Sequence, residues 1–124
     1  MSTADPIEQL MHDNLMAVFN ERDGAKRQAA IQRTYHPDVR WTDAEGVITG
    51  HAALEAKCIG LQRSIGDLQF EPAGPPHKLP YFGYLAWRLV DPAQGREEMS
   101  GFDVAVANEG LITELWTVLI PPTP

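Results

Sequence analysis

The fold of this chain is decided by residues 101–112, which read GFDVAVANEGLI. Phe102, Val104 and Val106 alternate with smaller or polar residues, and this period of two is typical of a β-strand. The polar segment Asn108-Glu109-Gly110 has the composition of a hairpin turn, and a second apolar run follows it. The stretch therefore predicts two antiparallel strands joined by a tight turn.

The strand pattern extends through the second half of the chain, while helical spacing dominates the first half. Strands are expected at 68–72, 81–90, 98–107 and 111–120, with a shorter strand and return flanking the turn 43–46. Helices are expected from Pro6 with a cap at Asp5, over roughly 25–34 with Tyr35 on its weak apolar face, and from His51 to a cap at Gly66. Helices that precede an antiparallel meander favour an α+β fold with the helices on one face of the sheet.

The first predicted helix carries an apolar stripe that contains one polar residue, Asn14. The stripe repeats at steps of three and four residues and comprises Ile7, Leu10, Met11, Asn14, Leu15, Val18 and Phe19. An amide on such a stripe either donates a hydrogen bond to a ligand or satisfies a neighbouring backbone group. The sequence leaves both roles for Asn14 open.

Composition and charge narrow the classes of function. The chain has 124 residues, 44% of them apolar, which predicts a single domain over residues 1–124. Ten basic residues against 17 acidic ones give a net charge of −7, so binding to nucleic acid is not expected. Cys58 is the only cysteine, and no apolar run is long enough for a membrane span, so we expect a cytoplasmic protein without membrane contact.

Motifs for metals and cofactors are missing from the sequence. His12, His36, His51 and His77 do not have the spacing of a paired metal site, and no glycine-rich phosphate loop is present. We therefore expect no metal and no cofactor.

Three stretches together resemble the NTF2-like superfamily, in particular its SnoaL-like polyketide cyclase and ketosteroid isomerase branch. They are residues 15–20 with Asp23, residues 35–43 with Gly46 and Gly50, and the hairpin 101–112. The resemblance covers nearly the whole chain. It implies a cone of three N-terminal helices packed on a curved, mostly antiparallel sheet, with a pocket for a small apolar molecule.

The resemblance assigns catalytic positions to two acids. Asp43 matches the general base of the ketosteroid isomerase branch, and Asp103 matches its second acid. A carboxyl group in an apolar pocket has a raised pKa, so it can exchange protons near neutral pH. The alternatives are that Asp43 only shapes a turn and that Asp103 faces solvent on an ordinary amphipathic strand.

The expected pocket combines small and aromatic residues. Ala105 shares a strand face with Asp103 and leaves room beside it, while Trp41 and Trp87 are candidate walls for a flat ligand, unless they only fill the core. Asn14 and Leu15 complete the predicted site. Leu15 stands where the isomerase branch has a tyrosine, and this difference argues against steroid isomerisation.

The outer face of the sheet suggests a second kind of partner. Trp116 is expected to share a strand face with Ile112, Glu114 and Val118, and so much apolar area on an outer face predicts a homodimer through the sheet. The leading hypothesis is a small-molecule-binding protein that acts as a cofactor-independent isomerase or cyclase by proton transfer on an apolar or polyketide-like substrate. The alternative is a non-catalytic ligand-binding or dimerisation module.

Overall fold

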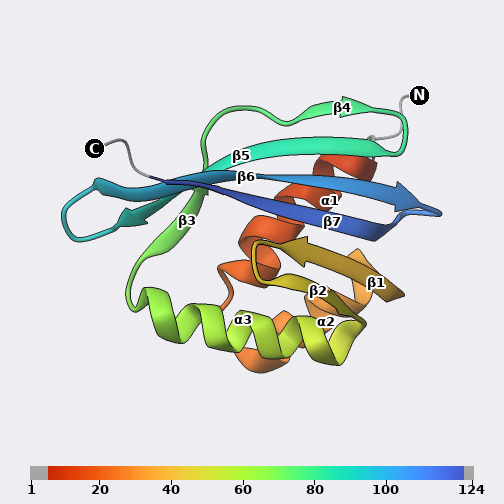
Figure 1. The fold of residues 1–124 in the computed structure, drawn as a ribbon, viewed down its shortest axis with the longest axis horizontal. Helices are drawn as coiled ribbons and strands as arrows, with labels where there is room; N and C mark the ends of the chain where they lie inside the picture. Colours follow the sequence, from red (N-terminus) through yellow and green to blue (C-terminus); the bar gives the residue numbers. More distant parts are fainter. Residues whose placement is uncertain (1–5, 122–124) are drawn as a thin grey trace.

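Helices and strands follow one another as the sequence predicts, with three helices before the long strands. The computed structural model of the protein describes residues 6–121, so the predicted cap at Asp5 and the end of the tail lie outside the described residues. Figure 1 shows the three helices and the curved sheet that they support.

The first helix changes its winding halfway along. The α-helix α1 (Pro6–Asp13) runs directly into a π-helical segment, η1 (Asn14–Phe19), where the sequence predicts a continuous α-helix. The seven residues of the predicted stripe are all buried. A π turn is wider than an α turn and is often found at functional sites. Here it begins at Asn14, the one polar member of the stripe.

The other two helices begin and end close to the expected residues. Helix α2 (Gly24–Thr34) is capped by Asp23, whose carboxylate accepts hydrogen bonds of 3.0 and 3.1 Å from the amides of Ala25 and Lys26. Helix α3 (His51–Ile65) ends at Gly66, whose φ of 61° favours glycine. It buries Cys58 on its inner face.

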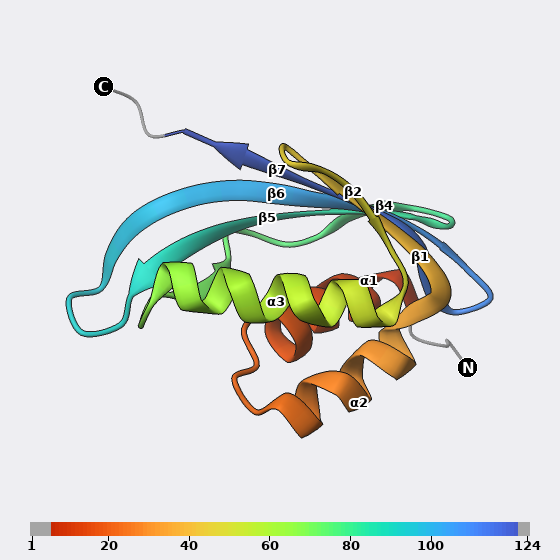
Figure 2. The same cartoon turned by 60° about the horizontal axis from the view of Figure 1, so that its bottom comes forward.

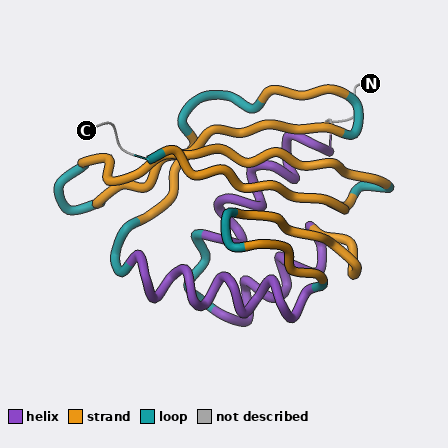
Figure 3. The backbone as a smooth tube through the Cα atoms, viewed as in Figure 1, coloured by secondary structure: helices purple, strands orange, loops and turns teal. Residues whose placement is uncertain are grey.

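Seven strands form one mixed sheet. In chain order they are β1 (Tyr35–Asp43), β2 (Gly46–Thr49), β3 (Gln69–Pro72), β4 (His77–Leu79), β5 (Phe82–Asp91), β6 (Arg96–Asn108) and β7 (Leu111–Ile120). Their order in the sheet is β2-β1-β7-β6-β5-β3, with β4 also paired to β5, and only β1 and β7 are parallel. Figure 3 shows β5, β6 and β7 side by side as the longest strands.

The sheet curves over the helices, which lie on one of its faces (Figure 2). The core fills this inner face with side chains from both layers, among them Leu15, Tyr35, Leu85 and Leu115. This arrangement is the predicted α+β cone. The short strand β4 is the element that the sequence did not predict, because its exposed residues lack the apolar alternation of a half-buried strand.

One prediction about β7 is wrong. Ile112 does not share a face with Trp116: Ile112 is fully buried, while Trp116 is 36% exposed. The pairing of β6 with β7 shifts by one residue after Val106, where Ala107 lies opposite Ile112. Such a bulge reverses the alternation of inward and outward side chains. Leu115 therefore points into the core and Trp116 points outward.

Candidate functional site

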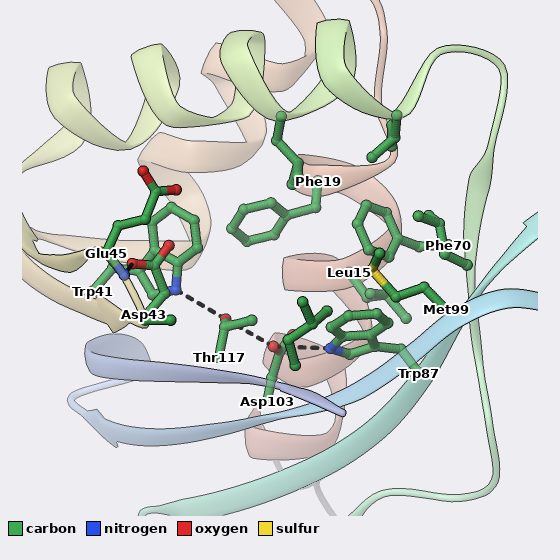
Figure 4. A pocket seen from close by; sticks show the side chains of 15 residues that line it. Leu15, Phe19, Trp41, Asp43, Glu45, Phe70, Trp87, Met99, Asp103 and Thr117 are labelled. Carbon is green, nitrogen blue, oxygen red and sulfur yellow. Dashed lines mark hydrogen bonds between the residues drawn. The ribbon is translucent and has the colours of Figure 1, made fainter. Parts of the chain in front are cut away.

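A cavity of about 320 Å³ lies between the helices and the concave face of the sheet (Figure 4). Most of its wall is aliphatic or aromatic, and its polar lining consists of three acids and a threonine. It is lined by Leu15, Phe19, Trp41, Asp43, Ala44, Glu45, Leu61, Ile65, Phe70, Trp87, Leu89, Met99, Asp103, Thr117 and Leu119. A cavity of this kind, apolar with a few polar groups, suits a small organic ligand.

Asp103 is the buried polar group of this cavity. It lies on β6, where strand alternation turns its side chain toward the helices, and the residue is only 2% exposed. The prediction that Asp103 and Ala105 share a strand face is confirmed, since both are buried on the inner face, together with Gly101 and Ala107. The solvent-facing alternative for Asp103 is excluded.

Three side chains from three elements donate hydrogen bonds to the carboxylate of Asp103. Asn14 donates from Nδ2 to Oδ2 at 2.8 Å. Trp87 donates from its indole nitrogen to Oδ1 at 3.1 Å, and Thr117 donates from its hydroxyl to Oδ1 at 2.9 Å. All three donors are neutral, so the carboxylate is held in a fixed orientation without a cationic partner.

A second layer of hydrogen bonds orients two of these donors. Tyr35 donates its phenol hydrogen to Oδ1 of Asn14, which leaves the amide nitrogen of Asn14 facing Asp103. The indole of Trp41 donates to the hydroxyl oxygen of Thr117 at 2.9 Å, so the Thr117 hydrogen is free to point at Asp103. Figure 4 shows the line that runs from Trp41 through Thr117 and Asp103 to Trp87.

Burial and hydrogen bonding act in opposite directions on Asp103. Burial raises the pKa of its carboxyl from 3.8 to about 6, and the hydrogen bonds from Thr117, Trp87 and Asn14 keep the pKa from rising further. The group therefore changes charge close to neutral pH. Burial also raises the pKa of Tyr35 well above 10, which keeps its phenol protonated as a donor.

Asp43, the other predicted acid, has a different environment. It ends β1 at the rim of the cavity, and its Oδ1 accepts a 2.8 Å hydrogen bond from the Glu45 amide, as in a turn. Its Oδ2 lies 3.2 Å from Nζ of Lys57. Lys57 also lies 3.3 Å from Glu45 and 5.4 Å from the centre of the Trp41 ring. Asp43 thus belongs to a charged cluster at the entrance.

The structure brings together most of the other residues expected at the site. Leu15, Trp41 and Trp87 line the cavity. Asn14 lies behind Asp103 as its hydrogen-bond donor, and not in the lining itself. Ala105 is fully buried on the same strand face, opposite Leu115 of β7, and it does not line the cavity.

Sequence reasoning missed Tyr35 and Thr117 as parts of the site, and it did not predict that Gly101 lies against Trp87. Tyr35 is expected on the apolar face of the second helix and also at the start of the stretch 35–43 that resembles the family's first strand, and it is the first residue of β1. Thr117 lies directly opposite Asp103 in the pairing of β6 with β7, a register that the sequence does not specify. A methyl group on Gly101 would approach Trp87 Cζ2 to 2.5 Å, so the glycine makes room for the indole that binds Asp103.

Two further observations concern metal binding and membrane insertion, neither of which the sequence predicts. Within residues 6–121, no group of three or more His, Cys, Asp or Glu side chains is placed to hold a metal ion. None of the helices in the same range is long and apolar enough to cross a membrane.

Comparison with known proteins locates the fold among solved structures. No family model matches the sequence, and no curated protein matches it. A candidate isomerase of the SnoaL-like family from Agrobacterium tumefaciens superposes with a TM-score of 0.85 at 24% identity, over 94% of this chain and 98% of that one. A candidate SnoaL-like polyketide cyclase from Jannaschia sp. CCS1 superposes with a TM-score of 0.70 at 16% identity, over 96% of this chain and 91% of that one.

A ligand complex is among the similar structures. TerC, co-crystallised with polyporic acid, superposes with a TM-score of 0.70 at 16% identity, over 93% of this chain and 92% of that one. At these identities the likeness concerns the fold and not the activity. The chain thus has the cone-shaped α+β fold of the SnoaL-like proteins, as its resemblance to the NTF2-like superfamily predicts.

Proposed function

We propose that the cavity binds a small, largely apolar molecule and that Asp103 exchanges a proton with it. The observation that carries this proposal is a carboxyl group that is 2% exposed in the wall of an apolar cavity, where burial raises its pKa to about 6. A general acid or base works best when its pKa lies near the working pH. A carboxyl group in a cleft whose pKa is shifted by burial is a candidate for a functional group.

The hydrogen bonds to Asp103 suit a base that must keep its position. Oδ1 accepts from Trp87 and Thr117, whereas Oδ2 accepts only from Asn14. Oδ2 therefore has the remaining acceptor position, where it can take a proton from the ligand. Isomerase and cyclase chemistry can both begin with such a step, and we propose this class of reaction without a cofactor.

Asp43 is given a different role in this proposal. Its carboxylate is paired with Lys57 at the rim, where it helps to hold the β1–β2 turn against α3. Leu15 in the cavity wall supplies no donor at the position of the isomerase branch's tyrosine. We therefore propose Asp103 alone as the acid-base group, and the two-acid arrangement of that branch is not required.

The decisive experiment is a carbon-detected NMR titration of the Asp103 carboxyl, repeated with the neutral fluorescent probe N-phenyl-1-naphthylamine. We expect a pKa of about 6 in the free protein and a change of the Asp103 resonance when the probe binds. A pKa near the ordinary value of about 3.9 would remove the proposed proton transfer. Probe binding that leaves Asp103 unchanged would place the binding site elsewhere.

A second candidate function is a non-catalytic ligand-binding or dimerisation module, and the outer face of the sheet favours it. Phe82, Trp116, Val118 and Ile120 are exposed there, and Trp116 and Val118 are 36% and 42% exposed. An exposed apolar surface of this kind is typical of a site that binds another protein chain. A homodimer through this face would be seen by sedimentation equilibrium and lost in Val118→Lys, whereas a monomeric wild type would exclude it.

The cytoplasmic location stays a prediction.

A further inference from the structure

The charges around the cavity all have one sign. Asp103 in the wall and Asp43 and Glu45 at the rim are its ionisable lining residues within the described chain, and no lysine, arginine or histidine lines it. The whole chain carries a net charge of −7. An anionic ligand would meet like charges both at the entrance and inside, while a cationic ligand would be attracted.

Asp103 is a buried carboxylate whose three protein donors are neutral. Buried carboxylates in proteins are normally paired with a cation. Lys57, beside the rim of the cavity, is engaged with Asp43 and Glu45. The counter-charge of Asp103 is therefore left for a ligand to supply.

The acceptor positions of the Asp103 carboxylate determine which kind of ligand group can form a hydrogen bond with it. A carboxylate offers about four acceptor positions. Asn14, Trp87 and Thr117 occupy three of them, and the remaining position is on Oδ2. Since an ionised carboxylate only accepts hydrogen bonds, the group that contacts it has to be a donor.

The walls of the cavity carry two pairs of aromatic rings. Phe19 and Trp41 form one pair with ring centres 5.1 Å apart, and Phe70 and Trp87 form a second pair at 5.2 Å. All four residues line the cavity, and Figure 4 shows the two pairs on different sides of it. Aromatic faces attract ammonium groups, particularly when water is excluded.

We propose that the cavity selects an apolar molecule with a single protonated amine, which donates to Oδ2 of Asp103 between the two aromatic pairs. This inference rests on the proposed function and narrows its ligand class, because the proton exchanged with Asp103 is then an N–H proton. The ammonium is the weaker acid of the pair, so in the bound state the proton stays on nitrogen and both groups are charged; a transfer to Oδ2 breaks the N–H bond, forms an O–H bond and leaves both groups neutral.

The test uses three probes that share one ring system and differ in the charge of one group. They are 2-naphthylmethylamine, 2-naphthylmethanol and 2-naphthoic acid, titrated into wild-type protein by calorimetry at pH 7.5. We expect the amine to bind about tenfold more tightly than the alcohol, since a charge-assisted hydrogen bond is about twice as strong as a neutral one, and the acid not to bind. The indole N–H resonance of Trp87 should move with the amine, and that of Trp116 should not.

Two variants separate the charge of Asp103 from that of the whole protein. Asp103→Asn removes the charge inside the cavity, so the amine should lose its advantage over the alcohol. Glu97→Gln removes one charge from an exposed position of the same strand, and the advantage should remain. If Asp103→Asn does not fold, the comparison of the three probes on the wild type still tests whether the cavity prefers a cationic ligand.

The outcomes distinguish this inference from the proposed function. An alcohol that binds as tightly as the amine, or an acid that binds most tightly, would overturn the selection for a cation and leave an apolar binding site. Failure of all three probes to bind would contradict the selection of an amine and also the proposed function of the cavity as a binding site. Preference for the amine that persists in Asp103→Asn would overturn the assignment of Asp103 as its partner.

Discussion

Tyr35 and Asn14 meet through a hydrogen bond in which the phenol of Tyr35 donates to the side-chain oxygen of Asn14. Both residues are fully buried, one at the start of β1 and the other at the start of the π-helical segment. The amide of Asn14 could otherwise present either its oxygen or its nitrogen to Asp103. The ionised carboxylate accepts only from the nitrogen, and the Tyr35 phenol supports the same orientation by donating to the oxygen, so we infer that Tyr35 is a positioning residue for Asp103.

The first prediction is that Tyr35→Phe raises the pKa of Asp103. Without the phenol, the Asn14 oxygen has no donor, and the amide no longer holds its nitrogen toward Asp103, so the ionised carboxylate loses stabilisation. The buried unsatisfied oxygen should also lower the free energy of unfolding by about 1–3 kcal/mol. The pKa is read by carbon-detected NMR. Tyr84→Phe on the outer face is the matched control, and an unchanged Asp103 pKa in Tyr35→Phe would contradict the positioning role.

The second prediction concerns how stability depends on pH. The pKa of Asp103 is about 6 in the folded protein against 3.8 for an unperturbed carboxyl, so the folded state binds the proton more tightly. The stability that this proton contributes is fully present below pH 4 and is lost as the pH rises through 6. Relative to Asp103→Asn, the free energy of unfolding of the wild type should fall by about 3 kcal/mol over this range.

Urea denaturation of both proteins between pH 4 and pH 8 measures this difference. Subtracting the Asn variant removes the contribution of all the other carboxyl groups. A difference that rises with pH would mean that the folded protein stabilises the charged form of Asp103, and the burial argument would then be wrong.

The sequence predicts the long strands well because their signals are local. The hairpin of β6 and β7 follows from the alternation around Asp103 and from the turn at residues 108–110, and the observed strands agree with it. The inward position of Asp103 follows from the same alternation. Asn14 was identified as an unusual residue because it interrupts an apolar helical stripe.

The partners of Asp103 could not be predicted, because they depend on contacts between distant segments. Thr117 reaches Asp103 only through the register of β6 with β7, and a bulge after Val106 shifts that register. Asn14 lies 89 residues from Asp103 in the chain. The same bulge explains why Ile112 is not on the face of Trp116: Ile112 and Leu115 are both buried although two residues, Thr113 and Glu114, separate them, and strict alternation cannot give that spacing.

The third prediction compares two glycines replaced by alanine. At Gly101 the added methyl group would come within 2.5 Å of Trp87 Cζ2 and closer still to the Val118 carbonyl oxygen. The indole must move away from Asp103, and we expect a loss of about 1–3 kcal/mol in the free energy of unfolding. At Gly60 in α3 nothing lies within 4 Å of the added methyl. Gly60→Ala should stabilise the protein by up to about 1 kcal/mol.

Thermal and urea denaturation of the two alanine variants give these values, and the pKa of Asp103 gives an independent readout. Displacement of the Trp87 donor should raise that pKa in Gly101→Ala and leave it unchanged in Gly60→Ala. Equal stability of the two variants would show that β6 can move away from Trp87 without cost.

The last prediction concerns the ion pair that joins α2 to α3. Arg27 is buried and binds Glu55 through two hydrogen bonds of 2.5 and 2.7 Å, and it also donates to the backbone oxygen of Glu21 and the side chain of Gln62. Arg27→Met leaves the Glu55 carboxylate without its partner. The Glu55 side chain is 16% exposed and keeps a hydrogen bond from Gln28, so we expect a loss of about 1–3 kcal/mol in the free energy of unfolding, less than for a fully buried pair.

Two further variants show whether the loss belongs to the pair or to the arginine alone. Arg63→Met, on the exposed part of α3, removes the same charge and should change stability by less than about 0.5 kcal/mol. The double variant Arg27→Met with Glu55→Met should be more stable than Arg27→Met, because no unpaired carboxylate remains. If it is no more stable, the bonds from Arg27 to Glu21 and Gln62, and not the ion pair, hold the two helices together.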